Sequence, residues 1–428
     1  MKKAILLLST LSFGAAGAFA TFPKPITTDT TDIIQMTDAL EMGADNVTVT
    51  HSYAGPRHWV GSLDLKGYDG TQLVINNVTG DASLYFGLNG VTFKNTGGDA
   101  TDSLIITNTG EKFYHMNGFI ADNLTLNIKA GDMYEISANG THQHRVAAQN
   151  NATVYWSKVT PKAQMMRFII GTEGSATDTN SAVHYRLSSV NYGNQATLTV
   201  YNGSFTMHDA GGRINLYTSN IYGLSSNSYI TDIGLADNAV VTIGSGITSK
   251  LITTNNNIVI GNNATLVVNS EEMFYRGSVS DTTDGDGYLI GTKVNVSSVR
   301  VGLYFTNAAK SANVVLGANN TFQSIGNNAG RTLNVTLNGN MFAVNNAIDF
   351  SSFELYIADF ENDLVKISTS TVDWQDHVTA MYKGVALTDL ELKDGFLFSQ
   401  SAVVPEPSEW AFIFGALALS FAAYRRRR

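Results

Sequence analysis

The stretch Asn-Asn-Ala-Thr-Leu-Val-Val at residues 262–268 decides the fold, because close variants of it recur along most of the chain. Its two asparagines tolerate the left-handed backbone of a tight turn, and the residues after them favour a β-strand. Apolar residues at helical spacing are nearly absent after residue 43, so the body is predicted to be all-β. Comparable runs lie at residues 46–50, 72–78, 103–110, 122–128, 150–156, 194–200, 237–244 and 331–339.

The turn residues have a biased composition and a regular spacing. The chain of 428 residues contains 39 Gly and only 6 Pro, and Asn is as frequent as Gly. Asn150, Asn194 and Asn238 each open a strand-like run, at equal intervals of 44 residues. Half of that interval, about 22 residues, is typical of one coil of a β-solenoid. Strand-like runs do occur halfway, at residues 167–171 and 213–219.

These features predict a right-handed parallel β-helix, or a closely related solenoid, over residues 61–340. Stacked coils bury an aliphatic interior, and equivalent Asn side chains can hydrogen-bond from coil to coil. The repeated phrase Asn-Ala-Thr-(Leu/Val)-x-Val resembles the passenger regions of autotransporters and other surface β-helices. A β-sandwich or a β-propeller would also contain short strands, but the chain has no blade-length repeat with fixed aromatic positions.

Two segments are expected to cover the ends of the solenoid, because exposed strand edges promote aggregation. Residues 21–60 are the expected N-terminal cap, in which residues 31–43 have the apolar spacing of an amphipathic helix. Residues 341–402 are the expected C-terminal β cap. Within it, residues 353–360 and 364–368 flank a turn and are predicted to pair as a hairpin.

The first 20 residues have the organisation of a secretory signal peptide. Lys2 and Lys3 precede an almost wholly apolar segment, and Ala18 and Ala20 provide the small residues required at a cleavage site. The sequence therefore predicts export, with cleavage before Thr21. A membrane anchor that is never removed is the alternative, but the apolar run is short for a span.

Residues 403–428 end the chain with Pro-Glu-Pro, an apolar run and four arginines. The apolar run, residues 410–424, would be about 22 Å long as a helix, a minimal length for a bilayer core of about 30 Å. Arginines beside such a span remain in the cytoplasm. We therefore expect a single transmembrane helix over residues 410–424, which stops transfer and leaves the body outside.

This order of elements resembles the PEP-CTERM sorting signal over the last 26 residues or so. The resemblance implies that a membrane-embedded exosortase-like enzyme recognises the tail, cuts near Pro-Glu-Pro and releases the protein to the exterior. Proteins with this signal occur in Gram-negative-type bacteria that make exopolysaccharide. The resemblance also implies an intermediate tethered at the inner membrane before the surface or matrix is reached. The recognition residues that it carries over are Pro405, Glu406, Pro407, Arg425, Arg426, Arg427 and Arg428.

The composition excludes several classes of function. The chain contains no Cys, so neither disulfides nor thiolate metal sites contribute to the fold. Its 36 Asp and Glu residues outnumber its 27 Lys and Arg residues, and removal of both terminal signals would make the body still more acidic. An acidic body argues against nucleic acid as a partner.

Two short patterns in the sequence contain residues that can bind a metal ion. His142 and His144 would share one face of an extended segment, but no further ligand has a matching spacing. The acidic turn at residues 281–287 contains three aspartates but lacks the ligand spacing of an EF-hand. We therefore predict no metal site and no cofactor, with one weak calcium site at this turn as the alternative.

A polysaccharide lyase or glycoside hydrolase is the main alternative to a structural role, since such enzymes also use β-helices. A lyase would need a base and a cation in its groove, whereas no carboxylate pair or common hydrolase motif stands out for a hydrolase. No catalytic residue is assigned. We expect an exported surface or matrix protein, structural or adhesive, that contacts extracellular polysaccharide and is not an enzyme. The groove of such a lyase could be lined by the densest basic region, which comprises Arg145, Lys158, Lys162 and Arg167. The alternative is that these side chains only keep a strand surface soluble.

Overall fold

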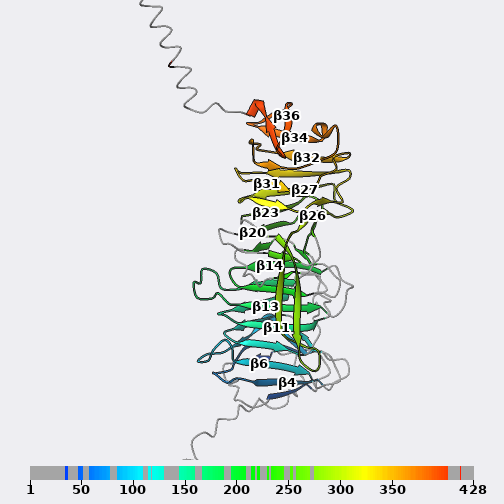
Figure 1. Ribbon diagram of the computed structural model, residues 1–428. Helices are drawn as coiled ribbons and strands as arrows, with labels where there is room; N and C mark the ends of the chain where they lie inside the picture. Colours follow the sequence, from blue (N-terminus) through cyan, green and yellow to red (C-terminus); the bar gives the residue numbers. More distant parts are fainter. Residues whose placement is uncertain are drawn as a thin grey trace, which may run out of the picture.

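The chain forms an elongated stack of short β-strands in the computed structural model (Figure 1). Successive strands lie across the long axis of the stack, with β4 (Thr71–Asn77) near one end and β36 (Leu390–Lys393) near the other. The structure describes residues 34–36, 47–51, 57–77, 84–108, 114–116, 118–129, 144–159, 166–187, 194–208, 214–216, 219–221, 229–230, 233–244, 251–253, 257–269, 274–402 and 415.

Strands from successive coils pair in parallel and build a first sheet of 21 strands within the described residues. This parallel stacking confirms the predicted all-β solenoid. The first sheet contains β1 (Ile34–Met36), β3 (Arg57–Asp64), β5 (Leu84–Lys94), β7 (Tyr114–Met116), β8 (Gly118–Asp122), β10 (His144–Gln149), β12 (Met166–Ile170), β14 (Asn194–Val200), β16 (Ile214–Leu216), β17 (Ser219–Ile221), β19 (Ile233–Leu235), β20 (Val240–Ile243), β22 (Asn257–Ile260), β23 (Ala264–Val268), β26 (Gly302–Phe305), β27 (Ser311–Leu316), β29 (Ile325–Gly326), β30 (Arg331–Thr336), β32 (Phe353–Ile357), β34 (Val378–Tyr382) and β35 (Val385–Ala386).

Two further sheets complete the coils, with 11 and 5 strands in the described part of the chain. The second sheet contains β2 (Val47–His51), β4, β6 (Ser103–Asn108), β9 (Thr125–Ile128), β11 (Thr153–Val159), β13 (Ala182–Leu187), β15 (Ser204–His208), β18 (Tyr229–Ile230), β21 (Leu251–Thr253), β24 (Phe274–Thr283) and β25 (Leu289–Arg300). The third sheet, towards the C-terminus, contains β28 (Asn320–Phe322), β31 (Phe342–Val344), β33 (Val365–Lys366), β36 and β37 (Phe396–Ser399).

Stacked apolar side chains form one continuous core along the inside of the coils. In the first sheet, Phe168 of β12 pairs with Val146 of β10 on one side and with Leu198 of β14 on the other. All three side chains have no exposed surface. Because side chains alternate along a strand, a short β-branched run is enough to place apolar groups in every coil.

Aromatic rings reinforce the core in the N-terminal part of the described stack. The ring of Trp156 lies between those of Phe119 and Tyr185, with centroid distances of 5.5 and 5.7 Å. Tyr185 also contacts Phe168 at 5.3 Å. These edge-to-face contacts join residues of neighbouring coils and add to the stabilisation gained from burial.

Asparagines with a left-handed backbone occupy the corners between strands, as their abundance in the sequence predicts. Asn tolerates this conformation because its short amide bonds the local backbone. The corner asparagines with positive φ are Asn123, Asn150, Asn151, Asn238, Asn263, Asn327 and Asn338.

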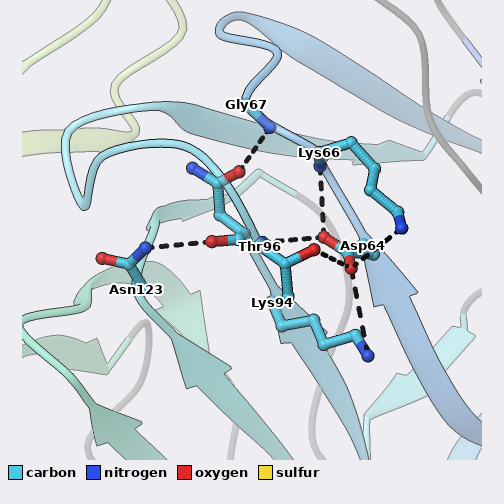
Figure 2. A network of polar contacts seen from close by, with 7 residues as sticks. Asp64, Lys66, Gly67, Lys94, Thr96 and Asn123 are labelled. Carbon is cyan, nitrogen blue, oxygen red and sulfur yellow. Dashed lines mark hydrogen bonds and ion pairs between the residues drawn. The ribbon is translucent and has the colours of Figure 1, made fainter.

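Figure 2 shows how a corner is held to the next coil. The carboxylate of Asp64, which is 4% exposed, accepts the Thr96 N–H at 2.9 Å, and the Lys94 ammonium lies 3.9 Å away. One coil further, Asn123 Nδ2 donates to the carbonyl of Asn95 at 2.9 Å. These side chains satisfy corner backbone groups that the strand ladder cannot reach.

The spacing of bonded corners gives the length of a coil. The hydrogen bonds from Asn334 Nδ2 to Ala312 O and from Asn338 Nδ2 to Leu316 O each join residues 22 apart, which confirms the expected coil length. Asn334 Nδ2 also lies 3.0 Å from Asn313 Oδ1 in the preceding coil. The predicted coil-to-coil bonding of asparagines is therefore present.

The 44-residue interval itself does not mark equivalent positions. Asn150 lies between β10 and β11, Asn194 begins β14, and Asn238 lies between β19 and β20. Coil length also varies, because Asn150 Nδ2 bonds Asp122 Oδ1 from 28 residues away. Corners accept extra residues without changing the strand register, since loops run over the surface. The strands expected halfway are nevertheless present, as β12 and as β16 with β17.

The expected N-terminal helical cap is wrong. Residues 34–36, in the middle of the predicted helix, form β1, and Ile34 of β1 is the parallel partner of Trp59 in β3. A short isolated helix is marginal in water, whereas the edge of β3 supplies backbone hydrogen-bond partners. Tertiary pairing therefore overrides the local helical pattern.

The expected transmembrane helix over residues 410–424 is also unsupported. No helix among the described residues is long and apolar enough to cross a membrane, and residue 415 is the one member of that segment that the structure describes. The apolar run is shorter than the roughly 20 residues that a spanning helix needs. Apart from residue 415, which is helical, the helical elements of the described chain are two short 3-10 helices, η1 (Trp374–His377) and η2 (Gln400–Ala402).

The hairpin expected within residues 353–368 is wrong as well, because the solenoid continues through this region. β32 pairs in parallel with β30 and β34 in the first sheet, whereas β33 pairs with β31 and β37 in the third. The turn between β32 and β33 is another corner, in which the Asp359 carboxylate accepts the N–H groups of Leu337 and Asn338, each at 2.7 Å. Antiparallel pairs β34–β35 and β36–β37 follow.

The carboxylate of Asp178 accepts several hydrogen bonds at one corner. It is 1% exposed and accepts the N–H groups of Asn150 and Asn151, at 2.8 and 2.9 Å, and the hydroxyl of Thr172 at 2.7 Å. Burial alone would raise the pKa of Asp178, but hydrogen bonds from Ser181, Asn151 and Thr172 hold it below its usual value.

We predict that Asp178→Ala lowers the free energy of unfolding by about 3 kcal/mol, because several buried donors lose their acceptor together. Thermal unfolding and amide exchange at Asn150 and Asn151 would measure this loss. Thr177→Ala in the same loop is the control and should change stability by less than about 0.5 kcal/mol. Equal shifts in the two variants would contradict the supporting role of the carboxylate.

Candidate functional site

A long hairpin, β24 with β25, departs from the regular coils. β24 begins in parallel with β21, from Phe274 to Arg276, and then pairs antiparallel with β25. In Figure 1 the two strands are the long light-green pair that runs across the stacked strands, along the axis of the stack. The hairpin therefore brings residues near position 284 back to coils that lie more than a hundred residues earlier in the chain.

The tip of the hairpin is fastened to the N-terminal part of the described stack. Lys129 Nζ, directly after β9, lies 2.6 Å from Asp284 Oδ2. The other carboxylate oxygen of Asp284 accepts the N–H groups of Asp286 and Tyr288, at 3.1 and 2.9 Å. The hydrogen bond from Lys129 lowers the pKa of Asp284, so the carboxylate is ionised at neutral pH.

The stem of the hairpin makes two more polar contacts with the second sheet. The Leu289 N–H donates to Ser157 Oγ of β11 at 2.9 Å, and Arg186 Nη1 of β13 lies 3.8 Å from Asp281 Oδ2. We call the residues that make these contacts, together with the neighbouring Tyr155 and His184 of the second sheet, the hairpin-covered cluster. Its members are Lys129, Tyr155, Ser157, His184, Arg186, Asp281 and Asp284.

His184 is the buried titratable group of this cluster. Its imidazole is 9% exposed and stacks on the ring of Tyr155, with centroids 4.7 Å apart. Burial lowers the pKa of His184 to about 4, and the charge of Asp281 opposes this shift only in part. The imidazole is therefore neutral at pH 7. Burial likewise raises the pKa of the Tyr155 hydroxyl.

The cluster contains groups that could transfer protons, but the hairpin covers them. A neutral imidazole near a carboxylate is a common acid–base combination. Here the imidazole of His184 belongs to β13, the carboxylate of Asp281 belongs to β24, and the hairpin is bonded to the sheet beneath. Nδ1 of His184 is buried and has no hydrogen-bond partner in the described part of the chain. As it stands, the arrangement fastens the hairpin rather than opening a substrate groove.

The structure separates the histidines and aspartates considered as metal ligands. His142 lies outside the described residues, and His144 begins β10. Asp281, Asp284 and Asp286 belong to the hairpin, where Asp284 closes the turn and pairs with Lys129. No group of three or more His, Cys, Asp or Glu residues in the described ranges is placed to hold a metal ion.

Part of the basic region is assembled by the fold. Arg145 of β10 and Arg167 of β12 are direct register partners on neighbouring coils. Lys158 lies in the second sheet, in β11, and Lys162 lies outside the described residues. The terminal residues assigned to processing, Ala18 and Ala20 in the leader and the sorting residues of the tail, also lie outside the described ranges.

Sequence reasoning missed the hairpin and the residues that it covers. The signal that could have revealed the hairpin is a doubled spacing between equivalent positions. Asn263 and Ser311, which are hydrogen-bonded on neighbouring coils, lie 48 residues apart, about twice the usual coil length. The insert contains strands of 10 and 12 residues, which are longer than the neighbouring strands of the coils. The partners Lys129, Ser157 and Arg186 could not be assigned, because nothing local indicates which way an inserted hairpin folds.

No known protein family matches this chain, and neither a curated protein nor a solved structure is significantly similar to it.

We predict that Lys129→Ala loosens the tip of the hairpin without unfolding the solenoid. A partly exposed ion pair contributes roughly 0.5–1 kcal/mol, so amide exchange at residues 284–288 should accelerate about two- to fivefold. Lys293→Ala, on the exposed side of the same hairpin, is the matched control and should leave that exchange unchanged. Equal acceleration in both variants would contradict the conclusion that the ion pair of Lys129 with Asp284 fastens the tip of the hairpin.

We also predict that His184 makes the fold sensitive to mild acid. Because its folded-state pKa of about 4 lies below the ordinary 6.5, the unfolded chain takes up the proton first as the pH falls. The contribution of His184 to stability is therefore complete above pH 6.5 and is lost progressively towards pH 4, by roughly 3 kcal/mol in total.

The measurement is the thermal midpoint between pH 7 and pH 4. His184→Phe keeps a ring against Tyr155 and should remove most of the decline, whereas His377→Phe at a partly exposed position should retain it. An unchanged decline in His184→Phe would show that other groups cause the acid sensitivity.

Proposed function

We propose that this protein is exported to the bacterial surface, where its solenoid has a structural or adhesive role in an extracellular polysaccharide layer. The observation that carries the proposal is the parallel ladder of the described strands, from β1 to β34, with corners closed by side-chain hydrogen bonds. Such a stack presents a long, repetitive surface and gains stability from each neighbouring coil. These properties suit a component that spans or binds an extended polymer.

The polar surface supports the same role. Strand positions that face solvent carry hydroxyl and amide groups, such as Ser278, Ser280 and Asn295 of the hairpin. These groups both donate and accept hydrogen bonds, as the hydroxyls of a polysaccharide do. The formal net charge of −9 also argues against nucleic acid as the partner.

The two ends of the chain support the proposed route to the surface. The leader, residues 1–20, would direct export. The tail resembles the PEP-CTERM signal, and an exosortase-like enzyme would recognise Pro405, Glu406 and Pro407 at the inner membrane before releasing the body. Both ends lie outside the described residues, so this route rests on their sequences.

The test is to express the full chain in a bacterium that makes exopolysaccharide and carries an exosortase-like enzyme. The extracellular polysaccharide would be sedimented, the mass of any protein in it measured, and the polymer assayed for new reducing or unsaturated ends. We expect protein that lacks both residues 1–20 and the arginine tail, sediments with the polymer and produces no new ends.

The other outcomes have definite meanings. New ends that depend on the protein would overturn the structural role in favour of a lyase or hydrolase. An intact tail on extracellular protein would overturn the proposed processing. Protein that is exported and processed but remains in the supernatant would overturn the association with polysaccharide.

A further inference from the structure

A basic column crosses the outer face of the first sheet. Arg145 of β10 is the register partner of Arg167 of β12, which is the partner of Thr197 of β14. The next residues along these strands, Val146 and Phe168, are buried in the core, so alternation turns the arginines and the threonine outward. Strands are spaced by about 4.8 Å, so the three side chains stand close together on consecutive coils.

Two polar atoms of this basic column have no hydrogen-bond partner within the part of the chain that the structure describes. Arg145 Nε and Thr197 Oγ1 are both buried without a hydrogen bond. They flank the exposed Arg167 on its two sides. Buried polar groups are normally hydrogen-bonded, so these two atoms show that the column is incompletely satisfied, while the exposed Arg167 is the group that a ligand can reach.

The charges in the basic column lead to the same conclusion. Two guanidiniums stand side by side in a chain whose acidic residues outnumber its basic ones. Burial and the neighbouring Arg167 charge lower the pKa of Arg145, so the pair is electrostatically unfavourable without a counter-charge. The described acidic side chains that form ion pairs lie elsewhere, at Asp64, Asp281 and Asp284 among others.

We propose that Arg145 and Arg167 form a binding site for the carboxylate groups of a uronate-containing polysaccharide. A guanidinium presents a planar fork of N–H donors that matches a carboxylate with two oxygens, and two forks on adjacent coils can share one such anion. This inference rests on the proposed association with polysaccharide and specifies its chemistry.

The test measures binding of the full-length protein to polygalacturonate in calcium-free buffer at low salt, with dextran and dextran sulfate in parallel. We expect the wild-type protein to bind polygalacturonate, and Arg145→Gln/Arg167→Gln to bind it at least tenfold more weakly. The control Lys293→Gln/Lys310→Gln removes the same charge from exposed positions and should weaken binding less than threefold. The single variant Arg167→Gln changes only an exposed side chain and should weaken binding without altering the thermal midpoint.

Several results would overturn the proposal. Equal weakening by the arginine and lysine pairs would mean that only net charge matters, and tight binding to dextran sulfate alone would identify a sulfate site. Failure of the wild-type protein to bind polygalacturonate would also reject the uronate. If the Arg145→Gln/Arg167→Gln protein still sediments with native exopolysaccharide, the proposed function survives and only this site fails.

Discussion

Hydrogen bonds from corner backbone groups to aspartate and asparagine side chains hold consecutive coils in register, and the rest of the structure depends on them. A parallel ladder satisfies the strands but leaves N–H and C=O groups unpaired wherever the chain turns. Asp178 and Asp359 accept such N–H groups from a neighbouring coil, and Asn123 and Asn338 donate to such carbonyls. A buried group left unpaired costs about 1–3 kcal/mol. The chain contains no Cys, so asparagine and aspartate side chains, and not disulfides, join its corners.

Corners that are held by side-chain hydrogen bonds also tolerate insertions. The β24–β25 hairpin is the largest such insertion in the described chain. It leaves one coil and returns to the next without breaking the pairing of β23 with β27. Its tip is then held by Lys129 and its stem by Arg186, so coils far apart in the stack become linked. The buried His184 beneath it stays neutral at pH 7 because protonation would place an unsolvated charge there.

The two large sheets therefore differ in which side chains they expose to solvent. The second sheet is partly covered by the hairpin, and its cluster of titratable groups is occupied in fastening that hairpin. The first sheet carries Arg145 and Arg167 on adjacent coils, and Arg145 Nε has no acceptor among the described residues. A solenoid suits recognition of a repeating polymer because it repeats side chains at the strand spacing.

The sequence by itself determined that the body is an all-β solenoid, since the alternation of short β-branched runs with asparagine turns is a local pattern that requires no knowledge of distant contacts. It also indicated a coil length of about 22 residues, which holds where Asn334 and Asn338 bond the preceding coil, and it determined the absence of disulfides. Only the tertiary structure decided that residues 34–36 pair as a strand, that the acidic turn meets Lys129, and that Arg145 stands beside Arg167. Each of these depends on which coil lies next to which and on how long each corner is. Corner lengths vary along this chain, so the juxtaposition of surface side chains is fixed by stacking and not by any spacing that the sequence displays.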